Sequence, residues 1–376
     1  MVNVKGLYEF LNEKDIQFFA GVPDSQLKPF CDYLSIRLGI GKEHIIATNE
    51  GNAVALAAGY HLATGKIGMV YLQNSGLGNA VNPITSLTDA EVYAIPVVYM
   101  IGWRGQPGVK DEPQHVKQGK ITLELLQLLG IKYQIVDKDS TIEDIRKVYN
   151  STFEDELKNG RSVAFVVEKN ALDNENTCKE QNTFELSREE AIQIIIDHLE
   201  KKDVVISTTG KASRELFEYR EKKAQGHEKD FLTVGSMGHA SMIATAIAEN
   251  TDKSVWCIDG DGAMLMHTGA AALIGSRKPK NLYHILINNG AHETVGGMPT
   301  ISYSIDWGKA TKAFGYMGEY QVKCALELSE TISRVRAQEG PIFIEVLVNL
   351  NSRDDLGRPT IKPVDNKKDI MTFIRN

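Results

Sequence analysis

Two short polar segments, each directly after an apolar run, constrain the fold of this chain most strongly. The apolar run 255–258 precedes Asp259-Gly260-Asp261-Gly262-Ala263, and the apolar run 282–287 precedes Asn288-Asn289-Gly290-Ala291. Short apolar runs that end in glycine turns predict buried strands, and 263–274 predicts a helix between them. Ligands of open α/β sheets lie outside the carboxyl ends of the strands, so we expect both segments at one edge of a sheet.

The two segments also contain the donor types of a metal-diphosphate site. A helix N-terminus offers free N–H groups to an anion, and Mg²⁺ needs only a few protein oxygens beside phosphate and water. The Asp261 carboxylate, the Asn289 amide oxygen and a carbonyl at Ala291 would supply those oxygens, within a turn formed by Gly260, Gly262 and Ala263. The simpler alternative is a pair of turn glycines and a polar loop. A dinucleotide fingerprint is excluded, because Leu265 stands where its third small residue belongs.

Length and composition indicate a soluble globular protein of two domains of ordinary size. The chain has 376 residues, 42% of them hydrophobic and 24% charged. No apolar run is long enough to span a membrane, and the N-terminus lacks the pattern of a signal peptide. The net charge of −7 argues against nucleic acid as a partner. Widely spaced cysteines without metal-ligand spacing predict a cytoplasmic protein with reduced thiols, at Cys31, Cys178, Cys257 and Cys324.

One polar stretch divides the chain. Residues 171–186 have no apolar periodicity and predict a linker, and Ser187 with Glu190 forms a capping box before the next helix. On both sides of the linker, short apolar runs are followed by a glycine-containing turn and a helix. This alternation predicts an α/β protein of two doubly wound parallel-sheet domains, at 1–170 and 187–376.

Gly-Asp-Gly followed at this distance by Asn-Asn resembles the shared motif of the thiamine diphosphate enzymes. The resemblance extends over nearly the full length. It implies thiamine diphosphate and Mg²⁺ as cofactors, with 1–170 as the pyrimidine-binding domain and 187–376 as the diphosphate-binding domain. Many relatives have a third domain between these two, for which the linker leaves no room. The resemblance further implies a homodimer or higher homo-oligomer with sites between subunits.

Glu50 lies at the start of an alanine-rich segment that predicts a closely packed helix. The resemblance implies that Glu50 is the family's catalytic glutamate, which hydrogen-bonds the N1′ atom of the cofactor and acts as a general acid–base group. Taken alone, Glu50 could equally be a helix N-terminal carboxylate favoured by the helix dipole.

A second glycine turn, Gly235-Ser236-Met237-Gly238, precedes another segment of small residues. The resemblance implies that Met237 wedges between the two rings of the cofactor, a role that suits its adaptable side chain. Gly235 and Ser236 would then contact the cofactor. The alternative is an ordinary methionine at the start of a helix.

Substrate contacts are expected from the first domain. Ser25 resembles the family's cavity-lining turn residue, although Asp24 replaces the usual glycine. The alternative is that Ser25 caps the following helix. The segment 103–120 contains four basic residues among glycines and prolines, which predict a long loop without a regular helix. Arg104 could bind an oxyanion bidentately and Lys110 could act as a point charge. A solvated loop is the competing interpretation.

Several segments resemble one branch of the family, the phosphonopyruvate and sulfopyruvate decarboxylases. They are Gly-Val-Pro-Asp-Ser, Asn-Glu-Gly-Asn-Ala, Ile-Gly-Trp-Arg-Gly and Asp-Glu-Pro-Gln-His. The resemblance implies a small anionic 2-oxo acid as substrate. We expect decarboxylation of 3-phosphonopyruvate to phosphonoacetaldehyde and CO₂ in phosphonate biosynthesis. Sulfopyruvate decarboxylation, or another thiamine diphosphate-dependent lyase or carboligase activity, is the alternative. A binding subunit without activity is disfavoured, because Glu50 and the metal-diphosphate residues are all present.

Overall fold

The computed structural model describes residues 1–173 and 182–376, which form two compact units. Unit 1 comprises residues 1–179 and 292–298, and unit 2 comprises residues 180–291 and 299–376. Cys178 and part of the predicted linker lie outside the described residues. The described cysteines Cys31, Cys257 and Cys324 are free thiols.

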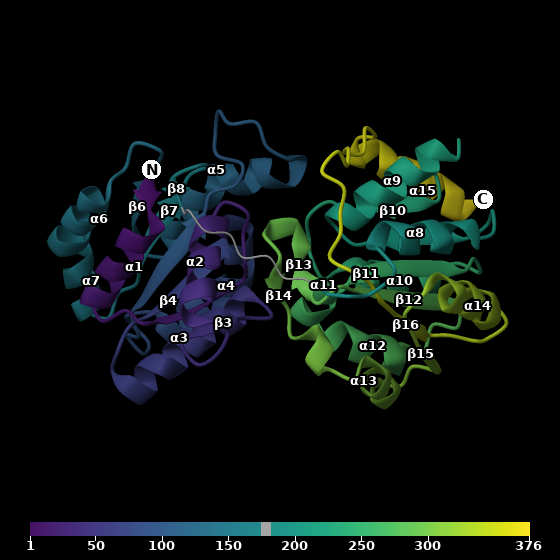
Figure 1. Cartoon of the computed structure of the whole chain (residues 1–376), viewed down its shortest axis with the longest axis horizontal. Helices are drawn as coiled ribbons and strands as arrows, with labels where there is room; N and C mark the ends of the chain where they lie inside the picture. The colour runs from purple at the N-terminus through teal and green to yellow at the C-terminus, as the bar shows by residue number, and fades with distance from the viewer. Residues whose placement is uncertain (174–181) are drawn as a thin grey trace. The chain divides into compact units, whose positions relative to one another are not determined.

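Unit 1 contains a parallel six-stranded sheet with strand order β3-β2-β4-β5-β7-β6 (Figure 1). The helices α1, α2 and α6 pack on one face of this sheet, and α3, α4 and α5 pack on the other. The short strands β1 and β8 pair beside it. The elements of unit 1 are β1 Val2–Asn3, α1 Val4–Glu13, β2 Phe18–Gly21, α2 Lys28–Leu38, β3 His44–Ile46, α3 Glu50–Thr64, β4 Gly68–Gln73, α4 Leu77–Pro83, β5 Val97–Gly102, α5 Pro113–Leu128, β6 Lys132–Val136, α6 Ile142–Val148, α7 Glu154–Lys158, β7 Val163–Val167 and β8 Leu172–Asp173.

Unit 2 contains a second parallel six-stranded sheet, with order β10-β9-β11-β12-β16-β15. The helices α8, α9 and α14 cover one face, and α10, α12 and α13 cover the other. The elements of unit 2 are α8 Arg188–Asp197, β9 Val204–Ser207, α9 Lys211–Lys222, β10 Asp230–Leu232, α10 Ala240–Ala248, β11 Val255–Gly260, α11 Asp261–Met266, α12 Gly269–Arg277, β12 Leu282–Asn288, α13 Trp307–Phe314, β15 Gly318–Val322, α14 Ala325–Val335, β16 Ile342–Leu347 and α15 Pro363–Arg375. The paired strands β13 Ala291–His292 and β14 Met298–Pro299 each contain one residue of unit 1 and one of unit 2.

The predicted fold class is confirmed. The central strands β5, β7, β12 and β16 are buried along their whole length, as near-continuous apolar strands of a sheet covered on both faces should be. β8 ends at Asp173 and α8 begins at Arg188, a separation too short for a third domain. The predicted capping box is present, since Ser187 accepts from the Glu190 amide and Glu190 accepts from the Ser187 amide.

Two predicted elements were wrong in extent. The helix α5 begins at Pro113, so the second half of the predicted loop 103–120 is helical. Proline suits this first helical position, where its missing N–H would have had no partner. The single helix expected at 263–274 is divided into α11 and α12. At the break, the Thr268 hydroxyl bonds the Met264 and Leu265 carbonyls, which satisfies the end of α11.

Among the described residues, no helix combines the length and the apolar character that crossing a membrane requires.

Candidate functional site

Four turns of unit 2 emerge at the same edge of its sheet, because β10, β9, β11 and β12 are parallel neighbours. The Gly235 amide donates a hydrogen bond of 3.0 Å to Thr209 Oγ1, which joins the turn after β10 to the turn after β9. A Cβ atom on Gly238 would lie 2.9 Å from the Ala263 carbonyl, so the turn after β10 also packs closely on α11. The structure therefore brings Gly235–Gly238 and the Asp261–Ala263 segment together within one unit.

Asp261 is the first residue of α11, and only 4% of it is exposed. Its Oδ2 atom accepts a hydrogen bond of 2.6 Å from the Thr300 hydroxyl. Burial, with a smaller contribution from the charge of Asp259, raises the pKa of Asp261 to about 7, although hydrogen bonds from Thr300 and the Gly262 amide oppose the rise. None of the described cationic side chains pairs with this carboxylate. A bound cation would supply the missing positive charge.

Asn288 and Asn289 have different surroundings at the end of β12. The Asn288 side chain is used within the protein, since it donates to Glu345 (2.7 Å) and accepts from the Gly290 amide (3.1 Å). Asn289 Oδ1 accepts from the Ala291 amide at 3.1 Å. Gly290 has φ of 70° and packs against the Tyr303 ring, so no other residue fits there.

The donors offered by Asp261, Asn289 and the Ala291 carbonyl are all oxygens, which is the preference of a hard cation such as Mg²⁺. Asp261 and Asn289 are buried, and Ala291 lies two residues after Asn289, so the chemistry of these residues fits the predicted metal site.

The turn that carries Met237 has an unusual backbone. Ser236 adopts φ of 51°, in the left-handed region that non-glycine residues rarely occupy, between Gly235 and Gly238. Its hydroxyl lies 3.3 Å from His239 Nδ1, and Met237 is half-buried. Such strain persists where the surroundings over-determine the backbone, often at ligand sites.

Glu50 is the first residue of α3 in unit 1, and it is 5% exposed. Burial raises its pKa, and a hydrogen bond of 2.7 Å from Asn79 Nδ2 to its Oε2 atom opposes the rise. Gly76 packs directly on the carboxylate, because a Cβ atom there would lie 2.3 Å from Glu50 Oε1. A carboxyl group with a raised pKa can both hold and donate a proton, which general acid–base catalysis requires. Asn79 and Gly76 are supporting residues that the sequence pattern alone did not single out.

Ser25 and Arg104 lie together at the carboxyl edge of the unit 1 sheet. Arg104 Nη1 donates to Ser25 Oγ at 3.0 Å, while the N-cap of α2 is Leu27, so Ser25 does not cap that helix. Asp111 holds the guanidinium bidentately, with Nη2–Oδ1 at 2.5 Å and Nε–Oδ2 at 2.8 Å. Burial opposes ionisation of Asp111, but Arg104 and two backbone amides hold its pKa well below the usual range.

The sequence predicted Arg104 as an anion-binding residue, but it gave no sign of this pairing with Asp111. Asn74 also fixes the Arg104 backbone, by accepting from its amide (3.1 Å) and donating to its carbonyl (2.8 Å). Lys110 is exposed, and among the described residues it forms no hydrogen bond or ion pair. The structure therefore brings Ser25 and Arg104 together and does not bring Lys110 to them.

Comparison with known families and proteins bears on both units. A model described as thiamine pyrophosphate enzyme, N-terminal TPP binding domain, matches residues 2–126. A model described as thiamine pyrophosphate enzyme, C-terminal TPP binding domain, matches residues 208–346. Thiamine pyrophosphate is another name for thiamine diphosphate.

Three curated relatives match most of the chain. A phosphonopyruvate decarboxylase from Streptomyces viridochromogenes is 30% identical, over 100% of this chain and 95% of the relative. A phosphonopyruvate decarboxylase from Streptomyces hygroscopicus is also 30% identical, over 96% of this chain and 92% of the relative. A sulfopyruvate decarboxylase from Methanosarcina acetivorans is 26% identical, over 90% of this chain and 89% of the relative.

Proposed function

Because the chain belongs to the thiamine diphosphate-dependent decarboxylases of 2-oxo acids, we propose that it converts 3-phosphonopyruvate to phosphonoacetaldehyde and CO₂. The observation that carries the choice of substrate is the Arg104 guanidinium, which Asp111 orients and whose Nη1 atom adjoins Ser25. A planar guanidinium beside a hydroxyl suits a tetrahedral oxyanion. Two relatives named for the phosphonate substrate match this chain over nearly its whole length, which supports the same choice.

We further propose that unit 2 holds thiamine diphosphate through Mg²⁺, with Asp261, the Asn289 side chain and the Ala291 carbonyl as ligands. Gly260, Gly262 and Ala263 would border the diphosphate, and Gly235, Ser236 and Met237 would contact the rest of the cofactor. These roles rest on the buried carboxylate of Asp261, the oxygen-only donor set and the close packing of the two turns. When bound, thiamine diphosphate supplies a nucleophilic carbon and an electron sink.

In this proposal the residues of unit 1 bind the substrate and move protons. Glu50 holds and transfers a proton at the N1′ atom of the cofactor, as its raised pKa permits. Arg104 and Ser25 bind the phosphonate. The bond between the substrate's carboxylate and its carbonyl carbon breaks, CO₂ leaves, and a proton takes its place on that carbon to give the aldehyde. The chain would act as a homo-oligomer in the cytoplasm, within phosphonate biosynthesis.

The test is CO₂ release by the purified full-length protein with thiamine diphosphate and Mg²⁺, with phosphonopyruvate, sulfopyruvate and pyruvate supplied in parallel. We expect kcat/KM to be higher for phosphonopyruvate than for sulfopyruvate or pyruvate. Asp261→Ala should release no CO₂ from any substrate at the same cofactor concentration, which controls for contaminating decarboxylases.

A preference for sulfopyruvate would overturn the proposed substrate. Carbon–carbon bond formation after addition of an acceptor aldehyde, without free phosphonoacetaldehyde, would favour a carboligase instead.

A further inference from the structure

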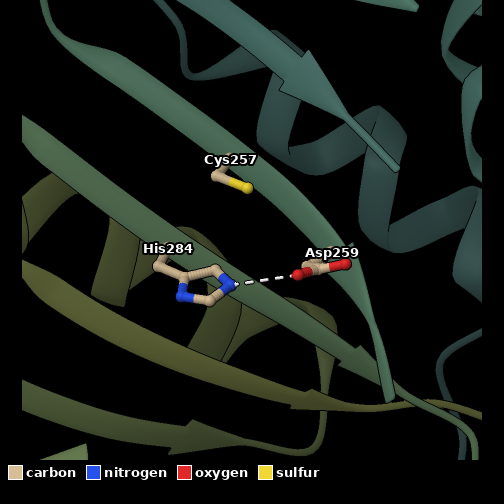
Figure 2. Close-up of side chains that lie close together, drawn as sticks. All are labelled: Cys257, Asp259 and His284. Atoms are coloured by element: carbon tan, nitrogen blue, oxygen red, sulfur yellow. Dashed lines mark ion pairs between the residues drawn. The ribbon is translucent and has the colours of Figure 1, made fainter. Parts of the chain in front are cut away.

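A cluster of polar side chains lies inside the apolar core of unit 2. Cys257 and Asp259 are alternate residues of β11, and His284 on β12 is in register with Cys257, so the three project from the same face of the sheet (Figure 2). Their exposed fractions are 0%, 1% and 0%. The side chains around them are mostly apolar, among them Leu286 and Phe343.

The cluster forms a chain of polar contacts that ends beside the predicted metal site. The Tyr316 hydroxyl lies 2.9 Å from His284 Nδ1, and His284 Nε2 lies 3.4 Å from Asp259 Oδ2. The other oxygen, Asp259 Oδ1, accepts from the Gly260 amide at 2.9 Å. Gly260 is the N-cap of α11, and Asp261 is the first residue of that helix. The turn therefore engages Asp259 Oδ1, while Oδ2 faces His284 Nε2 at 3.4 Å without a hydrogen bond.

This arrangement is costly if stability is its only role. Moving a carboxylate and an imidazole into an apolar core carries a desolvation penalty, and apolar residues of similar volume often give equal or higher stability. What the pair provides, and an apolar pair would not, is a fixed acceptor for the Gly260 amide. That amide precedes Asp261 directly, so rotation of the Asp259 carboxylate would change the geometry of the turn.

We propose that His284 and Tyr316 are positioning residues for the metal-diphosphate site. They hold the Asp259 carboxylate against the Gly260 amide, and thereby fix the turn from which Asp261 presents its carboxylate. This inference rests on the proposed role of Asp261 as a Mg²⁺ ligand. Partners that orient metal ligands are commonly worth 10- to 100-fold in metal affinity.

The same three residue types, Cys257, Asp259 and His284, have the chemistry of a transition-metal site, and their ligand atoms lie within 4.8 Å of one another. Two hydrogen bonds favour the positioning role. The Tyr316 hydroxyl lies 2.9 Å from His284 Nδ1, and Asp259 Oδ1 accepts from the Gly260 amide, so each side chain is held by a group of the protein. His284 Nε2 and Asp259 Oδ2 face each other at 3.4 Å without a hydrogen bond.

The experiment measures Mn²⁺ affinity of the full-length protein in the presence of thiamine diphosphate, from the electron paramagnetic resonance signal of free Mn²⁺. We expect about 10- to 100-fold weaker binding for His284→Leu and a smaller loss of the same sign for Tyr316→Phe. His284→Gln should recover part of the loss, because its amide can still donate to Asp259. Thermal unfolding of each variant without cofactor separates affinity from stability.

Two matched variants serve as controls. Tyr283→Phe removes a buried hydroxyl from the residue before His284 on the same strand, where the side chain faces the other core. Cys257→Ala removes the member of the cluster that takes no part in the chain of polar contacts. Both should bind Mn²⁺ within about twofold of the wild type, because neither supports the Gly260 turn.

Unchanged Mn²⁺ affinity in His284→Leu, with a fall in thermal stability alone, would overturn the inference and leave the cluster structural. Stoichiometric zinc that survives dialysis against EDTA, and that Cys257→Ala loses, would overturn it in favour of a structural metal. Asp261→Ala separates the two proposals. If Asp261→Ala retains Mn²⁺ affinity, the proposed metal site itself fails, whereas if only His284→Leu retains it, the positioning role fails alone.

Discussion

At the scale of single residues, the most informative groups are two buried carboxyl groups, Glu50 and Asp261. Burial raises the pKa of both, but their surroundings differ. Asn79 donates to Glu50, which leaves a carboxyl group able to exchange a proton. Asp261 begins α11 and accepts a hydrogen bond from the Thr300 hydroxyl, and a cation would suit this buried carboxylate. The same residue chemistry therefore supports a proton-transfer role in one unit and a metal-binding role in the other.

Glu50→Gln tests the proton-transfer role with little change in shape. Glutamine keeps a hydrogen-bonding side chain of the same size but cannot exchange a proton at neutral pH. We expect kcat to fall about 10²- to 10⁴-fold, the usual contribution of a general acid–base group. Thiamine diphosphate affinity, measured by quenching of tryptophan fluorescence, should change little. A kcat near that of the wild type would remove Glu50 from the mechanism.

At the scale of elements, the position of Glu50 depends on how two segments pack. The 3₁₀ turn Asn74–Gly76 and α4 follow β4, and they lie against the first turn of α3. Gly76 has φ of −71°, which any residue can adopt, so the need for glycine there is steric. The carboxylate of Glu50 occupies the space that a side chain at residue 76 would fill.

Gly76→Ala should therefore displace the Glu50 carboxylate although Glu50 itself is retained. We expect kcat to fall at least tenfold, and the free energy of unfolding to fall by about 1–3 kcal/mol, as is typical of overpacking. Gly78→Ala is the matched control, because nothing lies within 4 Å of a Cβ atom there. Steady-state kinetics and urea unfolding of both variants provide the comparison.

If Gly76→Ala loses stability but keeps its kcat, catalysis does not depend on where the Glu50 carboxylate lies. If Gly78→Ala loses as much activity as Gly76→Ala, the effect comes from a stiffer segment rather than from contact with Glu50.

At the scale of the whole molecule, the candidate residues are divided between the two units. Glu50, Ser25 and Arg104 belong to unit 1, whereas Asp261, Asn289 and Met237 belong to unit 2. In the proposed function, a complete active site needs one contribution from each unit. We propose that the two contributions come from different chains of a homo-oligomer, as the family resemblance implies.

Mixing two inactive variants tests this arrangement. If each site uses Glu50 of one chain and Asp261 of another, a mixed dimer of Glu50→Gln and Asp261→Ala contains one wild-type site and one doubly altered site. Random pairing of equal amounts of the two chains in a dimer should restore about a quarter of the wild-type activity. The activity is measured after the two variants are co-expressed and co-purified with different tags.

If both residues of a site came from one chain, every site in the mixture would carry one of the two changes. Activity would then stay at the level of the separate variants, which would contradict sites shared between subunits.

Sequence alone determined the local elements and the chemistry they carry. Apolar runs closed by glycine turns identified parallel strands in both halves, because strands buried on both faces must be apolar and their turns must be tight. Ser187 and Glu190 predicted the start of α8 correctly, since a capping box is a contact between residues close in sequence. The predicted loop 103–120 was wrong because a helix begins at Pro113. The predicted helix 263–274 was wrong because it is interrupted where the Thr268 hydroxyl bonds the end of α11.

Only the tertiary structure decided which distant residues meet. Asp111 lies on the Arg104 guanidinium, Gly76 on Glu50, and His284 on Asp259. The last of these contacts depends on the register of β11 against β12, and the other two depend on how loops and helices pack after their strands. Apolar periodicity specifies that a strand is buried, but it does not specify the neighbour or the register, which the crossover connections and the packing of both faces determine.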